Sequence, residues 1–442
     1  MGEKVERITV HAPTHGNETS NENLIQISYV NVLVIGISLI VFLASFSFLI
    51  FIYKRSKQQT LGVENRPSFQ RMTSISFRGK AYIKDLLYGQ VDRLNNKKDI
   101  KSQAAFLPYN TKREIPKSMF TIDEEVGSGN FGTVSKSEIM GLYHPNSKTV
   151  AAVKSINSAA TDNDLMDLLH EIKIMSYVQP HINLVSMIGS CKSDLETNGD
   201  LWLLIEFCQY GDLKNYLIKN EAAIINGNFN DPINSRCLLK WAYDVAKGMN
   251  YLSENRIMHG DLAARNILLD ENPLQQGSPV AKVADFGLSK KFYDNVNYTK
   301  RERLYVPWKW MAFEFLTKGF FTLKSDVWSF AVVVWEILSF GRIPYGHQEY
   351  TDVVKQIEQG FRLPCPDNIK HTTNWSPEAL YDELAKLCFI ADPDDRATFS
   401  EVVQAIAKHL STTELSRFER MDEEYQVTRT NNYLKLGQSE DF

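Results

Sequence analysis

His259-Gly-Asp261-Leu-Ala-Ala-Arg265-Asn266, with Asp285-Phe-Gly a short distance downstream, is the stretch of sequence that decides the fold. Asp261 can accept the proton of a substrate hydroxyl group. Asn266 and Asp285 offer the oxygen ligands that Mg²⁺ prefers. A proton acceptor followed by two candidate metal ligands indicates a site at which a phosphate group is handled.

A glycine-rich segment lies upstream of this stretch. Its residues are Gly127, Ser128, Gly129, Asn130, Phe131, Gly132 and, two positions on, Val134. Glycine lets the backbone approach phosphates, and backbone amides can then donate to them. A dinucleotide-binding fold uses the same spacing, but there a helix follows. Here a strand-like run at 149–156 follows, and an ordinary glycine hairpin is the other alternative.

Lys154 ends Ala-Ala-Val-Lys on that strand-like run, and its ammonium group can hold the α- and β-phosphates of a nucleotide. Glu171 follows on an amphipathic segment and could pair with Lys154, although by itself it would be a solvated helix charge. Further strand-like residues lie at 201–207, and helical patterns lie at 238–252, 325–338, 351–359 and 377–388. The order of these elements predicts a small sheet-rich lobe followed by a larger helical lobe.

Taken together, these motifs resemble those of protein kinases, and among them tyrosine kinases, over about residues 120–410. Serine/threonine kinases usually carry a lysine where this chain has Ala263. Pro307-Trp-Lys-Trp-Met-Ala is similar to the segment that seats the acceptor tyrosine. The resemblance implies an α+β, bilobed protein-kinase fold that uses ATP and Mg²⁺, or Mn²⁺ in its place. It also implies that Asp261, Lys154, Glu171, Arg265 and Asn266 carry the catalysis.

Three further segments resemble the platelet-derived growth factor and stem-cell factor receptor class: Leu107-Pro-Tyr-Asn, Glu206-Phe-Cys-Gln-Tyr-Gly-Asp-Leu and Asp294-Asn-Val-Asn-Tyr298. That class carries a long kinase insert and immunoglobulin-like ectodomains, whereas residues 219–236 are short here and the chain before the span is brief. By this resemblance, adenine would contact the backbone of Glu206 and Cys208, the gatekeeper Ile205, and Val134, Ala152 and Leu268. Met175, Met187, His259 and Phe286 would form a regulatory column anchored by Asp326, and Glu314 would pair with Arg396.

Four positions depart from the kinase pattern. Gly260 replaces the arginine that usually binds a phosphorylated activation loop, which puts activation of that kind in doubt. Phe313, Ala331 and Ala397 replace two prolines and a glycine and are expected to alter packing only. Because the chemical core is complete, the sequence favours an active enzyme. The alternative is a catalytically silent pseudokinase that acts as a membrane signalling scaffold, which Gly260 and Phe313 favour.

Residues 32–53 are apolar and uncharged, and about 20 such residues span a bilayer as a helix. The alternatives are a signal-peptide core, which is shorter, or a buried helix. Lys54, Arg55 and Lys57 predict that the following chain is cytoplasmic. The predicted organisation is a disordered outer segment at 1–31 with a glycosylation acceptor at Asn17, a juxtamembrane linker at 54–119 and a cytoplasmic tail at 411–442. This places the chain in the plasma membrane, crossing it once.

The composition excludes two function classes. The net charge of −4 gives no sign of nucleic-acid binding. The five cysteines are scattered and lack zinc-ligand spacing, so they are expected to be free thiols.

Several tyrosines are candidate regulatory sites. Tyr298 is the preferred autophosphorylation site, with Tyr293 beside it, because a phosphate there could pair with nearby Lys and Arg residues. Phosphorylated Tyr425 or Tyr433 could dock an SH2-type adaptor. The other expected partners are protein substrates that contain tyrosine, and a second copy of the chain or a co-receptor.

Overall fold

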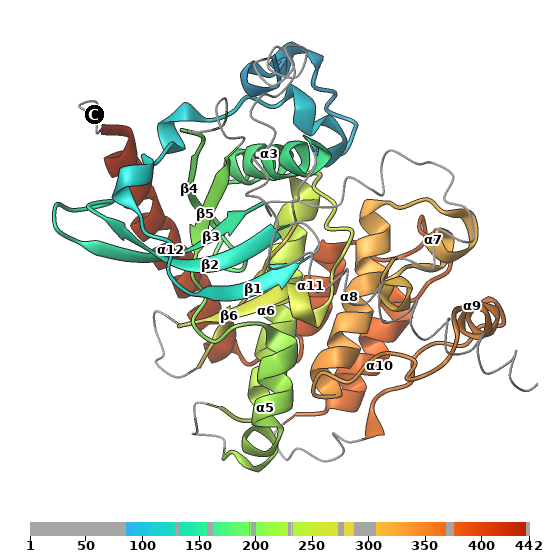
Figure 1. Cartoon of the computed structure of the whole chain (residues 1–442). Coiled ribbons are helices and arrows are strands. Elements are labelled where there is room, and N and C mark those ends of the chain that lie inside the picture. The colour runs from blue at the N-terminus through green and yellow to red at the C-terminus, as the bar shows by residue number, and fades with distance from the viewer. Residues whose placement is uncertain are drawn as a thin grey trace, which may run out of the picture. The chain divides into compact units, whose positions relative to one another are not determined.

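The computed structural model describes residues 85–129, 132–156, 162–193, 195, 200–228, 231, 233–272, 278–286, 306–367 and 375–438, apart from the side chains of 128, 129, 162 and 428–438. The N-terminal lobe is a five-stranded antiparallel sheet in the order β1-β2-β3-β5-β4. Its strands are β1 (Glu125–Gly129), β2 (Gly132–Met140), β3 (Lys148–Ser155), β4 (Met187–Cys191) and β5 (Trp202–Glu206). Helix α3 (Asp162–Tyr177) lies beside this sheet (Figure 1).

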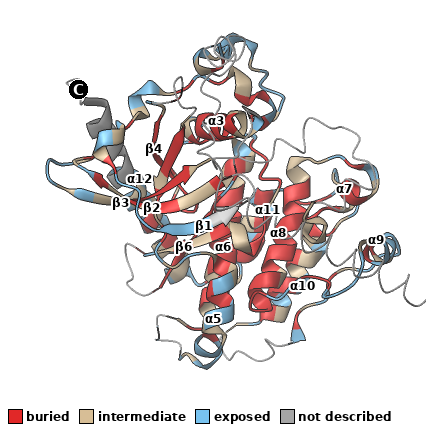
Figure 2. Ribbon diagram, viewed as in Figure 1, coloured by how far each residue is buried: buried red, intermediate tan, exposed pale blue. Residues whose placement is uncertain are grey.

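The C-terminal lobe is mainly helical. Its helices are α5 (Leu213–Asn226), α6 (Arg236–Glu254), α7 (Phe313–Lys318), α8 (Leu323–Leu338), α9 (Tyr350–Glu358), α10 (Pro377–Cys388) and α11 (Phe399–Ala407). A two-stranded sheet of β6 (Ile267–Asp270) and β7 (Val280–Val283) packs against α6. Helices α6 and α8 are buried along most of their length and form the centre of this lobe (Figure 2).

Local sequence explains where the central helices begin. Thr322 accepts a hydrogen bond from the start of α8, and the hydroxyl group of Ser325 bonds back to the Thr322 N–H. Such reciprocal capping satisfies the unpaired N–H groups of the first helical turn. Thr398 and Glu401 cap α11 in the same way. The strands and helices predicted from periodicity, and the bilobed kinase fold, are confirmed.

Residues 85–119 differ from the linker that the sequence predicts. They form four short 3₁₀ helices, η1 (Val91–Arg93), η2 (Lys101–Phe106), η3 (Thr111–Arg113) and η4 (Lys117–Met119), which fold onto the kinase lobes. Leu86, Ile100 and Leu107 are buried in the main apolar core. Because each helix is so short, its apolar residues show none of the periodicity by which a longer element is recognised.

The C-terminal tail also packs on the domain. Helix α12 (Thr412–Gln438) places Met421 in an apolar cluster with Ile182 and Val280. Within the residues that the structure describes, no helix is both long enough and apolar enough to cross a membrane. The predicted span at 32–53 and the glycosylation acceptor Asn17 lie outside those residues.

Candidate active site

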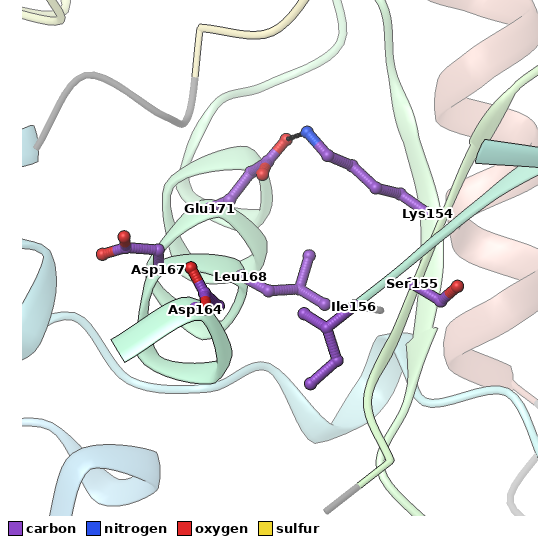
Figure 3. Close-up of a pocket in the computed structure, with 7 residues that line it drawn as sticks. All are labelled: Lys154, Ser155, Ile156, Asp164, Asp167, Leu168 and Glu171. Carbon is purple, nitrogen blue, oxygen red and sulfur yellow. Dashed lines mark hydrogen bonds and ion pairs between the residues drawn. The ribbon is translucent and has the colours of Figure 1, made fainter. Parts of the chain in front are cut away.

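Strand β3 and helix α3 bring Lys154 and Glu171 together. Lys154 Nζ donates to Glu171 Oε1 at 2.8 Å (Figure 3). It also donates to Asp285 Oδ1 at 3.1 Å. Lys154 and Glu171 are both buried. Although burial opposes it, the carboxylates of Asp285 and Glu171 raise the pKa of Lys154, so the ammonium group stays charged. This places a fixed positive charge at the junction of the two lobes.

A small pocket lies between β3 and α3 on one side of this ion pair. Its lining residues are Lys154, Ser155, Ile156, Asp164, Asp167, Leu168 and Glu171 (Figure 3). The side chains of Leu168 and Ile156 form its apolar wall, and Asp164 and Asp167 come from the first two turns of α3. The pocket thus lies directly beside the ion pair of Lys154 and Glu171, which form part of its lining.

Residues 256–266, here called the catalytic loop, carry Asp261, which is held from several directions. Arg265 donates to Asp261 Oδ1 at 2.5 Å, and Asn266 Nδ2 donates to the Asp261 carbonyl oxygen and to Oδ2 at 2.6 and 2.9 Å. Asp326 accepts from the N–H groups of His259 and Gly260 at 2.7 and 2.9 Å. Burial raises the pKa of Asp261. A carboxylate so oriented, with a raised pKa, is suited to accept a proton from a hydroxyl group.

Asn266 and Asp285 are the two candidate metal ligands of the site. The Ala284 N–H donates to the Asn266 carbonyl at 2.9 Å, which ties the two segments together. Lys154 lowers the pKa of Asp285, and the Asp285 side chain is 48% exposed. The Asn266 amide nitrogen is engaged by Asp261, so its oxygen is the atom that can ligate a cation. An ionised, accessible carboxylate beside an amide oxygen fits Mg²⁺.

Apolar residues between the lobes form a surface suited to a flat aromatic ring. Val185, Cys208 and Ala284 cluster with Ile205 and Leu268. Two of the other expected adenine contacts lie nearby in the sheet: Ala152 pairs with Ile205 across β3 and β5, and Val134 pairs with Lys154 across β2 and β3. The Glu206 carboxylate accepts from the Ser186 N–H at 2.7 Å and pairs with Lys282 at 3.2 Å, so this side chain is engaged within the protein.

The glycine-rich segment is the hairpin between β1 and β2, in which Gly129 is opposite Gly132. A Cβ atom on Gly132 would lie 1.9 Å from the Ser155 carbonyl oxygen, so this close approach of two strands requires glycine. A Cβ atom on Gly127 would meet no atom within 4 Å. Asn130 and Phe131 lie outside the described residues, as does the side chain of Ser128.

Glu336 is a functional residue that sequence reasoning missed. Its Oε2 accepts from the Ala264 N–H and from the Trp310 indole N–H, both at 2.8 Å. The Arg265 guanidinium lies 4.8 Å from the centre of the Trp310 ring. Burial raises the pKa of Glu336 to about 7. Glu336 thus joins the expected acceptor floor to the catalytic loop. The signal for it was an acidic residue in the otherwise apolar end of α8, where a buried charge requires partners.

The structure describes some of the remaining predicted residues and not others. Met175, Met187, His259 and Phe286 are all buried, and Glu314 and Arg396 form a buried ion pair at 2.8 Å. Tyr293 and Tyr298 lie outside the described residues, and Tyr433 lies in α12 with its side chain outside them. Tyr425 is half-buried, with its hydroxyl group 2.7 Å from Ser186 Oγ.

Comparisons with known proteins agree with this geometry. Residues 120–406 match the family model for the protein tyrosine and serine/threonine kinase domain. The tyrosine kinase receptor Cad96Ca of Drosophila melanogaster is 34% identical over 312 residues, which cover 69% of this chain and 38% of that receptor. The vascular endothelial growth factor receptor 3 of Danio rerio is 30% identical over 359 residues (72% and 25%). The fibroblast growth factor receptor of Ciona intestinalis is 33% identical over 311 residues (68% and 39%).

The chain therefore spans between 25% and 39% of the length of these relatives. The family match covers the two lobes and every motif around Lys154, Asp261 and Asp285. On that match, the chain belongs to the protein tyrosine and serine/threonine kinase family.

Proposed function

We propose that this chain is a receptor-type protein-tyrosine kinase that transfers the γ-phosphoryl group of ATP to tyrosine hydroxyl groups in protein substrates and in itself. The observation that carries the proposal is the assembled site: Lys154 bonds both Glu171 and Asp285, while Asn266 and Arg265 orient Asp261. Catalysis of phosphoryl transfer consists almost entirely of positioning and charge stabilisation, and this arrangement supplies both.

Each residue has a distinct role in the proposed reaction. Lys154, oriented by Glu171, binds the α- and β-phosphates. Asp261 orients the tyrosine hydroxyl group and accepts its proton. Asn266 and Asp285 would hold Mg²⁺, which offsets negative charge on the phosphate oxygens when it is bound. Arg265 and Trp310, held by Glu336, form the floor on which the acceptor tyrosine lies.

The receptor assignment has its own support. Three relatives named as receptors, one of them as a tyrosine kinase receptor, share 30–34% identity with the chain. The apolar run at 32–53 and the cations that follow it support one membrane span with the kinase in the cytoplasm. The three segments quoted above support a relation to the platelet-derived growth factor and stem-cell factor receptor class. Dimerisation or a co-receptor would provide the activating contact.

Phosphorylated tyrosines would provide the output. Tyr298 and Tyr293 lie between the metal-binding Asp285 and Glu314, where an activation loop is expected. Tyr425 and Tyr433 are the candidate docking sites for SH2-type adaptors. Because the Tyr425 hydroxyl group contacts Ser186, its phosphorylation requires α12 to leave the domain first.

The test uses the full chain, purified in detergent and incubated with Mg-ATP and a tyrosine-containing polymer. We expect phosphotyrosine to form, and we expect an Asp261→Asn variant to lose about 10²–10⁴-fold in rate, because it lacks the proton acceptor. A serine-containing polymer is the specificity control. Nucleotide binding without phosphoryl transfer would contradict the proposal and favour the scaffold.

A further inference from the structure

Residues 85–107, here called the N-terminal bridge, contact both halves of the candidate active site. Near each of its two ends the bridge is bonded to α3, because Lys173 donates to the carbonyl oxygens of Leu86 and Ala105, both at 2.9 Å. Leu86 shares the main apolar core with Ile172. Helix α3 also carries Glu171, so the two ends of the bridge are fixed to the element that orients Lys154.

Between these two contacts, the bridge is bonded to the catalytic loop at three successive residues, 99–101. The Asp99 carboxylate accepts from the Met258 N–H at 2.9 Å. The Ile100 N–H donates to the Arg256 carbonyl at 3.0 Å. Lys101 Nζ donates to the His259 carbonyl at 2.8 Å. The last of these bonds reaches the peptide group that leads directly into Gly260 and Asp261.

That peptide group is clamped from both sides. Its carbonyl oxygen, on His259, accepts from Lys101, and its N–H, on Gly260, donates to Asp326. Gly260 has a φ of 80°, in the left-handed region that glycine adopts without strain. Glycine also restricts its own backbone least. The orientation of Asp261 therefore depends on contacts made to the neighbouring peptide rather than on a side chain at position 260.

Lys101 also balances charge. It is only 4% exposed, and the charged groups that act on it include the carboxylates of Asp99, Asp326, Glu171 and Asp261. A buried carboxylate such as Asp326 is stable only with a compensating cation or full hydrogen bonding. Gly260 has no side chain to supply that cation. Lys101 brings it from a segment that precedes the matched kinase domain.

We propose that Lys101 is a positioning residue for phosphoryl transfer, which supplies the positive charge beside the catalytic loop that Gly260 cannot supply and thereby holds Asp261 in its working orientation. This inference rests on the proposed function for its kinetic consequence, but not for its structural one. Through Lys173, the same bridge links the position of α3 to that of the catalytic loop.

The test compares three variants of the full chain. Lys101→Met removes the charge and the donor, and Lys101→Arg keeps a cation. Lys98→Met is the matched control, because Lys98 is an exposed lysine three residues away on the same bridge. If Lys101→Met does not fold, Lys101→Gln, which keeps a neutral donor, replaces it.

The first readout is amide hydrogen exchange over residues 256–266. We expect Lys101→Met to speed exchange there by about tenfold or more, because a buried charge-assisted hydrogen bond is lost. Exchange in α8 should not change. The second readout is kinetic: kcat should fall about tenfold or more while KM for ATP stays within about threefold, and Lys101→Arg should retain most of kcat.

Unchanged exchange at 256–266 in Lys101→Met, or an equal increase in Lys98→Met, would overturn the inference. A fall in kcat together with an equal loss of exchange protection in α8 and in residues 256–266 would also overturn it, because that result would show a purely structural role. If the unmodified chain forms no phosphotyrosine, the proposed function fails, and the exchange measurement still decides the role of Lys101.

Discussion

Two buried ion pairs in this molecule have similar chemistry and different surroundings. The Arg396 guanidinium bonds both Glu314 oxygens at 2.9 and 2.8 Å and also donates to the Ile390 and Lys324 carbonyls. Glu314 Oε1 accepts in addition from the Ser325 hydroxyl group at 2.6 Å. The Arg396 and Glu314 side chains are 0% and 2% exposed. This pair is saturated with hydrogen bonds, and nothing remains for a ligand to bind.

The Lys154–Glu171 pair is incomplete by comparison. Glu171 Oε2 is buried and has no hydrogen-bond partner among the described residues. The second carboxylate on Lys154, that of Asp285, is 48% exposed. A buried polar atom without a partner is costly, and such atoms concentrate where a ligand completes the site. The number of satisfied hydrogen-bonding atoms, rather than burial, therefore separates a stabilising ion pair from one that is available to a substrate.

The largest expected effect is on stability, at the saturated pair. Arg396→Met should lower the free energy of unfolding by about 3–5 kcal/mol, because it leaves Glu314 buried without its cation. Activity per folded molecule should stay near that of the unmodified chain. Denaturant unfolding and initial rates measure the two quantities. A double variant, Glu314→Leu with Arg396→Met, should recover part of the loss, and failure of both variants to change stability would break the comparison.

At the Lys154–Glu171 pair, a substitution should affect the rate of phosphorylation more than the free energy of unfolding. Lys154→Met should reduce the rate of tyrosine phosphorylation by about 10²–10³-fold, because a preorganised charge on the phosphates is lost. Its effect on unfolding should be smaller than that of Arg396→Met, since Glu171, whose pKa burial raises, can take up a proton. Lys148→Met is the control on the same strand, where Lys148 pairs with Glu138 in solvent. Equal rates for the two variants would contradict the assignment of Lys154.

Much of this contrast could be read from the sequence. The spacing of Lys154, Glu171, Asp261 and Asp285 predicted the components of the site, because phosphoryl transfer needs those groups in that order. The saturation of Arg396 could not be predicted, since three of its acceptors are backbone carbonyls, which carry no sequence signal.

The N-terminal bridge and α12 were missed for a related reason. Their anchoring contacts join residues far apart in the sequence: 68 positions separate Lys173 from Ala105, 158 separate Lys101 from His259, and 239 separate Tyr425 from Ser186. Local periodicity reports only on neighbours in the sequence, so it predicted a linker and a tail. A buried lysine in a polar segment gives no sign of burial until its partner is placed beside it.

A third ion pair, between Arg236 and Glu414, is partly exposed. Its loss should have an intermediate, pH-dependent effect on the free energy of unfolding. Although burial opposes it, hydrogen bonds from Arg236 and Ser411 lower the pKa of Glu414 to about 2. Because the folded state lowers this pKa, the pair stabilises the protein above the unfolded value of about 4.5, and this is lost as pH falls towards 2. Glu414→Gln should cost about 1–2 kcal/mol at pH 7, after solvent screening, and progressively less below pH 5. Unfolding at pH 7 and pH 3 measures this, and a cost that does not depend on pH would contradict it.

The smallest expected effect is at a neutral contact of α12. The Tyr425 hydroxyl group lies 2.7 Å from Ser186 Oγ, and the Lys282 ammonium lies 4.9 Å from the ring centre. Tyr425→Phe keeps the ring against Lys282 and removes one neutral hydrogen bond, so it should lower the free energy of unfolding by about 0.5–1.5 kcal/mol. Amide exchange in α12 should rise while phosphorylation rates hold. If neither changes, the hydrogen bond between Tyr425 and Ser186 contributes nothing measurable to the stability of the folded chain. The contact then does not hold α12 in place, and Tyr425 is open to phosphorylation without prior release of the helix.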